Sequence, residues 1–336
     1  MSEQPNLFNF ATSELSQDAF ICWLLSWAAP GNREFDQKLH ECAKRLLDIF
    51  FDKHSKGKPP SYNCVEVRKQ DNFIDILCII NYDIYILIED KTWTKNHSDQ
   101  LRRYVDNIKS KNISESKILP IYFKTGDQSD YREIHKNGYI VFSRSDFLKV
   151  LNAGHMTGIT NQIFLDYRNH LQKIDNEVNS YKILPVSEWK WESWKGFFIE
   201  LQQLLKDGNW DYVPNPSGGF LGFWWHFQGD DQCEQYLQLE QEKCCFKIWV
   251  NDSSQRAKLR NQWHRTIHDI GRGLGINIVK PQRFGNGQYM TVAILDEEYR
   301  KENTDGTVDM HSTVDFLKKA EIVLKTIAAD KHITRT

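Results

Sequence analysis

Two apolar runs separated by three residues constrain this chain more than any other feature. Residues 73–80 and 84–88 are rich in Ile, Leu and Tyr and, apart from Asp75, are apolar at consecutive positions. A strand with one face in water alternates apolar and polar residues, so these runs predict strands that are buried on both faces. Helices are then needed on both sides of the sheet, which predicts an α/β arrangement.

The same segment places ionisable side chains among its apolar residues. If the two strands pair as a hairpin around residues 81–83, Asp75 lies directly opposite Glu89 on one sheet face. Side chains alternate along a strand, so Lys91 lies on that face and the Asp90 side chain points to the other. Two facing carboxylates oppose folding in apolar surroundings, and one ammonium leaves them a charge short.

A divalent cation is the expected completion of this charge balance. The donors are hard oxygens without an accompanying His or Cys ligand, which selects Mg²⁺ or Mn²⁺ over Zn²⁺. Such an ion orients a water molecule and stabilises charge on a phosphoryl oxygen, while Lys91 holds the water or shares the developing charge. The alternative is a structural ion-pair cluster of Asp75, Glu89 and Lys91 at a solvated sheet edge. The unbroken apolar flanks argue against it.

The 336 residues have room for about two domains. Further helices are expected over 12–29, 34–51, 98–110 with Ser98 as its cap, and 145–151, and further strands over 62–68, 118–123 and 139–142. Residues 174–187 lose apolar periodicity, so domains are expected at 1–173 and 188–336. The second is predicted to be α+β, with helices over 188–206, 255–273 and 312–329 and strands over 220–227, 235–240, 245–250 and 289–295.

The acids and their elements resemble the PD-(D/E)XK nuclease superfamily. Asp75 matches the first acid and Glu89-Asp90-Lys91 matches the (D/E)XK triplet, although Ile74 stands where the superfamily name has Pro. The resemblance covers residues 6 to about 150 and implies a restriction-endonuclease-like mixed sheet core flanked by helices. It also implies that the carbonyl of Asp90 is a further metal ligand.

Two more matches narrow the resemblance. Gln100 and Tyr104 look like the QxxxY element of the RecB-like branch, and residues 6–28 resemble the opening helix of a bacterial subfamily. Spaced four apart, Gln100 and Tyr104 share a helix face, from which both could reach a phosphate or a water. A solvated Gln100 and a core Tyr104 are the alternative. Glu14 lies at the start of the first expected helix, where a carboxylate interacts favourably with the helix dipole. The resemblance implies instead that Glu14 is a further metal ligand.

The resemblance implies a metal-dependent nuclease that hydrolyses phosphodiester bonds, with DNA as the favoured substrate and defence against phage or other foreign DNA as a role. Cleavage of RNA, tRNA included, and a vestigial binding or sensing module stay open. The formal net charge is −2, so nucleic-acid binding needs a local patch. Arg256 and Arg260 on a cationic helix stripe, and Lys124 at a strand end, are candidates; a solvated helix face is the alternative for the stripe.

The cysteine pattern bears on the compartment. Seven cysteines without a CxxC pair predict reduced thiols and a cytoplasmic protein. The apolar stretch 19–29 is shorter than a membrane span, so no membrane partner is expected. The sequence leaves homo-oligomer formation open.

Overall fold

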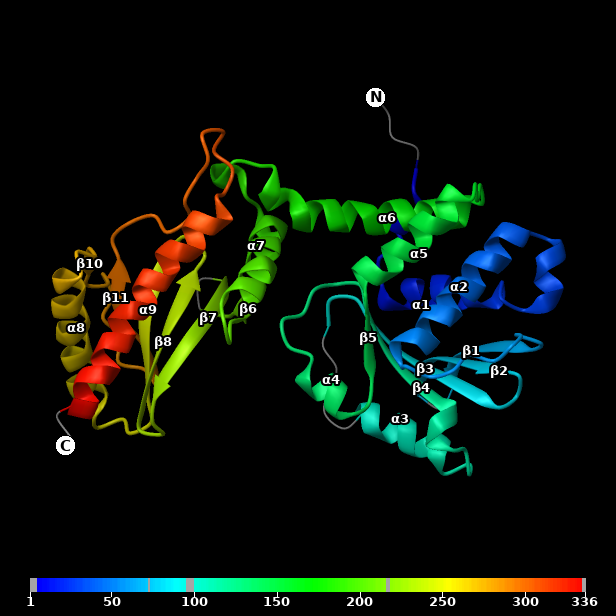
Figure 1. Ribbon diagram of the computed structural model, residues 1–336, viewed down its shortest axis with the longest axis horizontal. Helices are drawn as coiled ribbons and strands as arrows, with labels where there is room; N and C mark the ends of the chain where they lie inside the picture. The colour runs from blue at the N-terminus through cyan, green and yellow to red at the C-terminus, as the bar shows by residue number, and fades with distance from the viewer. Residues whose placement is uncertain (1–4, 72, 95–99, 216–217, 334–336) are drawn as a thin grey trace. The chain divides into compact units, whose positions relative to one another are not determined.

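The computed structural model describes residues 5–71, 73–94, 100–215 and 218–333. The chain divides into two compact units, Met1–Asn176 and Glu177–Thr336 (Figure 1). Each unit has its own sheet and its own hydrophobic core. Among the helices described, none combines the length and the hydropathy of a membrane-spanning segment.

The first unit is built on a five-stranded sheet in the order β1-β2-β3-β4-β5. Its strands are β1 (Val65–Asp71), β2 (Ile74–Ile80), β3 (Ile84–Lys91), β4 (Ile118–Lys124) and β5 (Ile140–Ser143). The pairs β1–β2 and β2–β3 are antiparallel, whereas β3–β4 and β4–β5 are parallel. The predicted mixed sheet is therefore confirmed, and β2 and β3 are interior strands.

The hairpin of β2 and β3 has the predicted register. Ile80 faces Ile84 across the turn, and the pairs continue in step along both strands. Asn81 and Tyr82 have φ values of 51° and 61°, and the Asp83 N–H donates to the Ile80 carbonyl at 3.1 Å, which closes a tight turn. This turn fixes the register that directs the two acids to one face.

Helices lie on both faces of this sheet, as predicted. They are α1 (Glu14–Ser26), α2 (Gln37–Lys53), α3 (Gln100–Lys109), α4 (Arg132–Lys136), α5 (Arg144–Met156) and α6 (Gln162–Val178). Short 3₁₀ helices join the elements of the chain: η1 (Leu7–Asn9), η2 (Pro30–Glu34), η3 (Glu115–Lys117), η4 (Asn179–Lys182) and η5 (Val186–Glu188). The helices α1, α2, α5 and α6 share a core with Ile76 and Ile86. The helix α3 packs on the opposite face, against Leu77 and Leu87.

Some helix predictions need correction. The sequence pattern did not indicate α4 or α6, and α6 extends into the stretch that was expected to lack periodic structure. The helix α5 continues past its predicted end at residue 151 to Met156. It includes Gly154, where a Cβ would lie 2.8 Å from the Cys42 sulfur, so the glycine allows close packing. The expected cap Ser98 lies outside the described residues.

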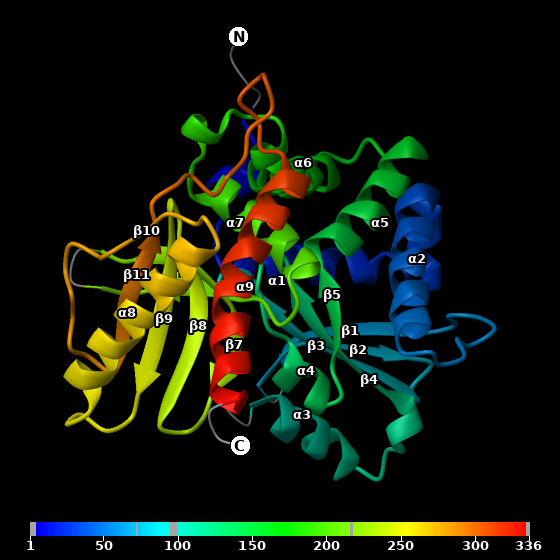
Figure 2. The same cartoon turned by 60° about the vertical axis from the view of Figure 1, so that its left-hand side comes forward.

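The second unit contains a six-stranded antiparallel sheet in the order β10-β11-β9-β8-β7-β6. Its strands are β6 (Asn209–Val213), β7 (Phe220–Gly229), β8 (Cys233–Glu240), β9 (Lys243–Val250), β10 (Ile278–Val279) and β11 (Tyr289–Leu295). Its helices are α7 (Trp191–Leu204), α8 (Arg256–Gly273) and α9 (Met310–Ile333). They bury one sheet face in a common core, and Figure 2 shows α8 and α9 against that face. The predicted α+β class is confirmed, although β6 and β10 were not predicted.

Candidate active site

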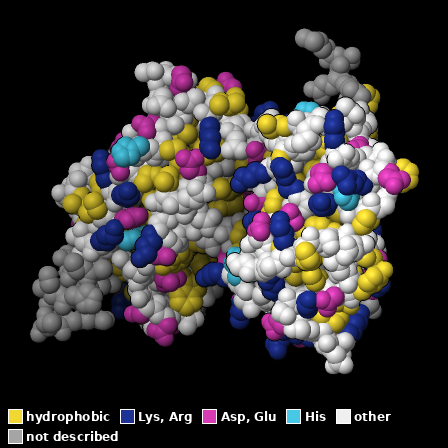
Figure 3. All heavy atoms as spheres, turned by 45° about the vertical axis from the view of Figure 1, so that its right-hand side comes forward, with side chains coloured by type: hydrophobic (Ala, Val, Ile, Leu, Met, Phe, Trp, Pro, Cys, Tyr) yellow, Lys and Arg dark blue, Asp and Glu magenta, His cyan; other side chains and the backbone are white. Residues whose placement is uncertain are grey.

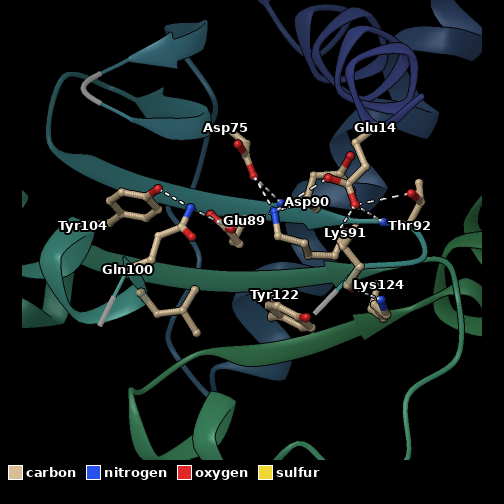
Figure 4. Close-up of polar contacts among 12 residues, drawn as sticks. Glu14, Asp75, Glu89, Asp90, Lys91, Thr92, Gln100, Tyr104, Tyr122 and Lys124 are labelled. Carbon is tan, nitrogen blue, oxygen red and sulfur yellow. Dashed lines mark hydrogen bonds and ion pairs between the residues drawn. The ribbon is translucent and has the colours of Figure 1, made fainter. Parts of the chain in front are cut away.

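Strands β2 and β3 bring two carboxylates and one ammonium together on the sheet face that α3 covers (Figure 4). The Lys91 Nζ lies 2.8 Å from Glu89 Oε1 and 3.5 Å from Asp75 Oδ2. The strand alternation argued from the sequence produces this grouping. Glu89 is only 1 % exposed and sits on an interior strand. The alternative of an ion cluster at a solvated sheet edge is therefore wrong in its location.

Asp90 contributes its main chain to this face and its side chain to the other. Its N–H donates to Asp75 Oδ2 at 2.9 Å, and its carbonyl accepts from Lys91 Nζ at 2.8 Å. On the opposite face, Asp90 Oδ1 accepts a hydrogen bond from Gln17 Nε2 of α1 at 2.5 Å. The side chain thus ties β3 to α1, while the backbone oxygen faces the carboxylate group.

Glu14 reaches the same end of β3 from the first turn of α1. Its Oε1 accepts hydrogen bonds from the Thr92 N–H at 3.0 Å and from Thr94 Oγ1 at 2.6 Å, and its Oε2 lies 4.0 Å from Lys91 Nζ. Burial opposes the charge of Glu14, but these hydrogen bonds and the nearby ammonium lower its pKa overall. Thr92 and Thr94 were not singled out from the sequence; their one signal is that they lie one and three residues after Lys91.

Gln100 and Tyr104 approach the carboxylates from α3. Gln100 Nε2 donates to Glu89 Oε1 at 3.1 Å and also contacts the Tyr104 hydroxyl. Tyr104 is 6 % exposed and belongs to the core beneath α3, so the core alternative for this residue is confirmed. The solvated alternative for Gln100 is wrong, because its amide is bonded to a buried carboxylate.

The two charged partners respond differently to burial. Burial, reinforced by the charge of Asp75, raises the pKa of Glu89 to about 7. Burial opposes the charge of Lys91 as well, but the surrounding carboxylates of Glu89, Asp75 and Glu14 outweigh it and raise the Lys91 pKa. Both pKa shifts have the direction expected when several carboxylates share one ammonium. Lys91 stays protonated, and the negative charge of Glu89 is only partly neutralised.

Lys124 lies beside Lys91 on the neighbouring parallel strand β4. It is 1 % exposed, and its Nζ donates to the Thr94 carbonyl at 2.5 Å. Burial lowers the pKa of Lys124 to about 8. The structure thus places this predicted phosphate contact at the site's margin (Figure 4), as a buried amine and not as a surface cation.

Under β3 lies a polar network that the sequence did not reveal. Gln17 Oε1 accepts hydrogen bonds from Thr125 Oγ1 at 2.6 Å and from the Tyr167 hydroxyl at 2.9 Å. Asp18 is a near neighbour of Asp90, and burial raises the pKa of both carboxyls. The available signal was that Gln17 and Asp18 directly precede the apolar run of α1, residues 19–25. Their partners are too distant in sequence to be inferred from it.

Arg256 and Arg260 belong to the second unit, on α8. Arg256 Nε donates to the Val250 carbonyl at 3.3 Å, and Arg260 Nη1 donates to the Gly285 carbonyl at 2.7 Å. The Arg260 guanidinium also lies over the Phe284 ring, 4.5 Å from its centroid. On the face drawn in Figure 3, Lys and Arg side chains are interspersed with Asp and Glu. The two arginines are thus held by their own unit and are only half-buried.

The oxygen atoms of the site suit a hard cation. Among the described residues no three His, Cys, Asp or Glu side chains form a ready-made ligand group, since the Lys91 ammonium lies between the carboxylates. Glu89 Oε2, however, is buried and has no hydrogen-bond partner in the described part of the chain. Together with the Asp75 carboxylate and the Asp90 carbonyl it makes a donor set of hard oxygens, which fits Mg²⁺ or Mn²⁺.

Comparison with known protein families identifies a match to the first unit. A family model described as the PD-(D/E)XK nuclease superfamily matches residues 5–191, more than half of the 336 residues. The matched region includes both acid-bearing strands and the helices α1 and α3. No curated protein and no solved structure matches the chain.

Proposed function

Because the chain belongs to the PD-(D/E)XK nuclease superfamily, we propose that it hydrolyses phosphodiester bonds of DNA at the site formed by Asp75, Glu89 and Lys91. One observation carries the proposal: the Lys91 ammonium lies within 3.5 Å of carboxylates from two adjacent interior strands. Burying this charge group opposes folding, and buried ionisable clusters of this kind concentrate at catalytic sites.

The proposed cofactor is Mg²⁺ or Mn²⁺, held by Asp75, Glu89 and the Asp90 carbonyl, with Glu14 as a further ligand directly or through water. When bound, the ion supplies an activated water and neutralises charge on the phosphoryl group. Two features support this ligand set. Glu89 Oε2 lacks a hydrogen-bond partner among the described residues, and the hydrogen bonds from Thr92 and Thr94 keep Glu14 ionised.

Lys91 acts in this proposal as a hydrogen-bond donor. The neighbouring carboxylates raise its pKa, so the amine is protonated at neutral pH and is unsuited to accept a proton. An ammonium beside the phosphoryl group orients the water and shares the negative charge that develops during attack. Gln100 holds Glu89 Oε1 and leaves Oε2 available, and Tyr104 supports the Gln100 amide.

The branch of the superfamily and the phosphate contacts are proposed from the positions of individual side chains. The contact between Gln100 and Glu89 supports placement in the RecB-like branch, where such a QxxxY element is expected. Lys124, Arg256 and Arg260 are proposed phosphate contacts; Lys124 has the closer link, since it lies beside Lys91. Defence against foreign DNA is the proposed biological role, on the strength of the resemblance alone.

A substrate panel tests the proposal. Single-stranded DNA, double-stranded DNA and RNA are incubated with the full chain and Mg²⁺, with and without a chelator. We expect chelator-sensitive cleavage of DNA, reduced by at least about 10²-fold in Lys91→Ala, because removing one preorganised charge from a site has effects of this size. Lys117→Ala is the matched control, since Lys117 forms an exposed ion pair with Asp83 in the same unit.

The outcomes separate the alternatives. Cleavage that persists in Lys91→Ala would mean a contaminating nuclease or a different active site. Cleavage of RNA alone would replace the DNA assignment with an RNA nuclease that uses the same chemistry. Binding of nucleic acid without any cleavage would make the domain a binding or sensing module.

A further inference from the structure

The second unit carries a pocket that the proposed nuclease chemistry does not use. The helices α7, α8 and α9 pack on the sheet face that includes Phe223 and Leu237. Side chains alternate along a strand, so their neighbours Trp224 and Tyr236 point to the other face. A pocket of about 700 Å³ lies on that second face, a volume typical of small-molecule sites.

Aromatic side chains form much of the pocket wall. They are Phe220, Trp224, Phe227, Tyr236 and Tyr289. Phe227 and Tyr236 are stacked, with ring centroids 5.0 Å apart and planes inclined by 16°. Phe227 is 44 % exposed and Tyr289 is 64 % exposed, so their ring faces remain accessible. The wall therefore offers flat apolar surfaces to which a planar ligand can stack.

Polar atoms also line the pocket. Tyr236 is 5 % exposed, yet its hydroxyl forms no hydrogen bond with any described residue. Gln238 is equally buried; its Nε2 donates to Glu240 Oε1 at 3.1 Å, and its amide oxygen has no partner in the described ranges. Neither oxygen belongs to the buried, unpaired side-chain atoms of the described residues, so both are accessible from the pocket. A ligand with matching donors and acceptors can form hydrogen bonds with them.

The charges of the pocket select against phosphate. Glu234 and Glu240 line it, with Lys247 as the accompanying cation. Lys247 Nζ is bonded to Glu240 at 2.9 Å, whereas Glu234 forms no ion pair with a described residue. The surplus carboxylate repels a phosphate group but accepts a hydrogen bond from an amino group, as carboxylates do from the amino group of cytosine.

We propose that this pocket binds an unpaired nucleobase that carries an exocyclic amino group, stacked on its aromatic side chains, with the sugar-phosphate backbone outside. Stacking needs an accessible base face, which single-stranded nucleic acid presents and an intact duplex does not. The inference rests on the proposed function, because it takes nucleic acid as the substrate of the chain. Cytosine, adenine and guanine are expected to bind better than thymine or uracil, which lack the amino group.

Oligonucleotide binding to full-length Lys91→Ala protein in the presence of a chelator tests the pocket without cleavage. Fluorescence anisotropy is measured with labelled oligodeoxycytidine and oligothymidine of equal length. We expect oligodeoxycytidine to bind about tenfold more tightly, a difference in the range of one good base contact. Adding Trp224→Ala should weaken that binding about tenfold or more, because one stacked base is lost. Trp191→Ala is the control, since Trp191 is 41 % exposed and lies outside the pocket lining.

A second substitution keeps the test decisive if Trp224→Ala unfolds the unit. Phe227→Ala removes an exposed ring and should weaken binding in the same way, and Gln238→Leu should lower the preference for cytosine while retaining stacking. Equal binding of both oligonucleotides, unchanged binding in Trp224→Ala and Phe227→Ala, or tighter binding of choline than of deoxycytidine would overturn the inference. The choline result would indicate a cation cage instead.

This experiment also separates the two proposals. If DNA is cleaved in a Lys91-dependent manner but the pocket variants bind normally, only the pocket assignment fails. If oligodeoxycytidine binding depends on Trp224 but the parent chain cleaves nothing, the nuclease proposal fails and the pocket assignment stands.

Discussion

The two units differ in how they compensate a carboxylate: Glu89 of the first unit is buried, and Glu321 of the second is half-buried. Glu89, on strand β3 of the first unit, shares the Lys91 ammonium with Asp75, and its Oε2 has no hydrogen-bond partner among the described residues. Glu321, against the sheet of the second unit, accepts hydrogen bonds from the Trp225 indole at 3.1 Å and from Lys325 at 2.8 Å. Satisfied polar groups are compatible with stability, whereas an undercompensated charge opposes it. The incompletely neutralised carboxylate therefore lies in the first sheet, at the candidate active site, where it opposes stability.

The largest expected effect is the difference between neutralising Glu89 and neutralising Glu321, measured in cleavage rate and in the free energy of unfolding. We expect Glu89→Gln to reduce metal-dependent cleavage by about 10²- to 10³-fold while the free energy of unfolding stays equal or rises, because acid–acid repulsion is relieved. Glu321→Gln should leave cleavage unchanged and lower the free energy of unfolding by up to about 1 kcal/mol. Cleavage rates and urea unfolding of both variants provide the measurement. An unfolded Glu89→Gln protein would favour a purely structural ion cluster.

The pH dependence of stability sharpens the same contrast. The folded pKa of Glu89, about 7, lies above its ordinary value of 4.5, so the folded state binds this proton more tightly than the unfolded state. Its contribution to stability is complete below pH 4.5 and is lost as the pH rises through 7. At about 1.4 kcal/mol per pH unit, the loss is roughly 3 kcal/mol.

Urea unfolding between pH 5 and 8 with a chelator present measures this loss. The parent chain and Glu321→Gln should lose stability in parallel as the pH rises, whereas Glu89→Gln should show a flatter profile. Parallel profiles for all three proteins would contradict an undercompensated Glu89.

A smaller effect is expected at the amide that supports Glu89. Gln100→Ala should reduce cleavage by about 10- to 100-fold, the range for removing a group that orients a metal ligand, because Glu89 Oε1 loses its donor at 3.1 Å. The reduction should appear as weaker Mg²⁺ dependence, measured by titrating the ion. Gln172→Ala is the control, since the Gln172 side chain donates to Asn176 on the exposed surface of α6 and has no other hydrogen bond within the described part of the chain. Equal Mg²⁺ titrations would remove Gln100 from the site.

The smallest effect is expected in the second unit, at Arg260. If its guanidinium contacts one phosphate, Arg260→Ala should reduce the slope of log Kd against log salt by about one for DNA binding. Loss of its hydrogen bonds to the Phe284 and Gly285 carbonyls should lower the free energy of unfolding by about 1 kcal/mol. A lowered stability with an unchanged salt slope would leave Arg260 a structural residue and confine phosphate contacts to other side chains.

Local patterns were sufficient for the sheet of the first unit. The hairpin pairs residues close in sequence, from Ile80 with Ile84 to Ile76 with Ile88, and the strand period of two then puts Asp75 and Glu89 on one face. The four-residue spacing predicted that Gln100 and Tyr104 share a helix face, but the contact of Gln100 with Glu89 depends on how α3 packs on the sheet. The sequence pattern did not predict the helix α6, which spans Gln162–Val178.

The sequence by itself determined that an acid pair and a lysine share one face of a buried sheet, because alternation along strands and a short turn are local properties of the chain. Only the tertiary structure decided that Glu14 from α1 meets Thr92 and Lys91 and that Gln17 links Asp90 to Tyr167. These contacts join elements far apart in sequence. Their geometry depends on how α1 packs against β3, which no local periodicity encodes.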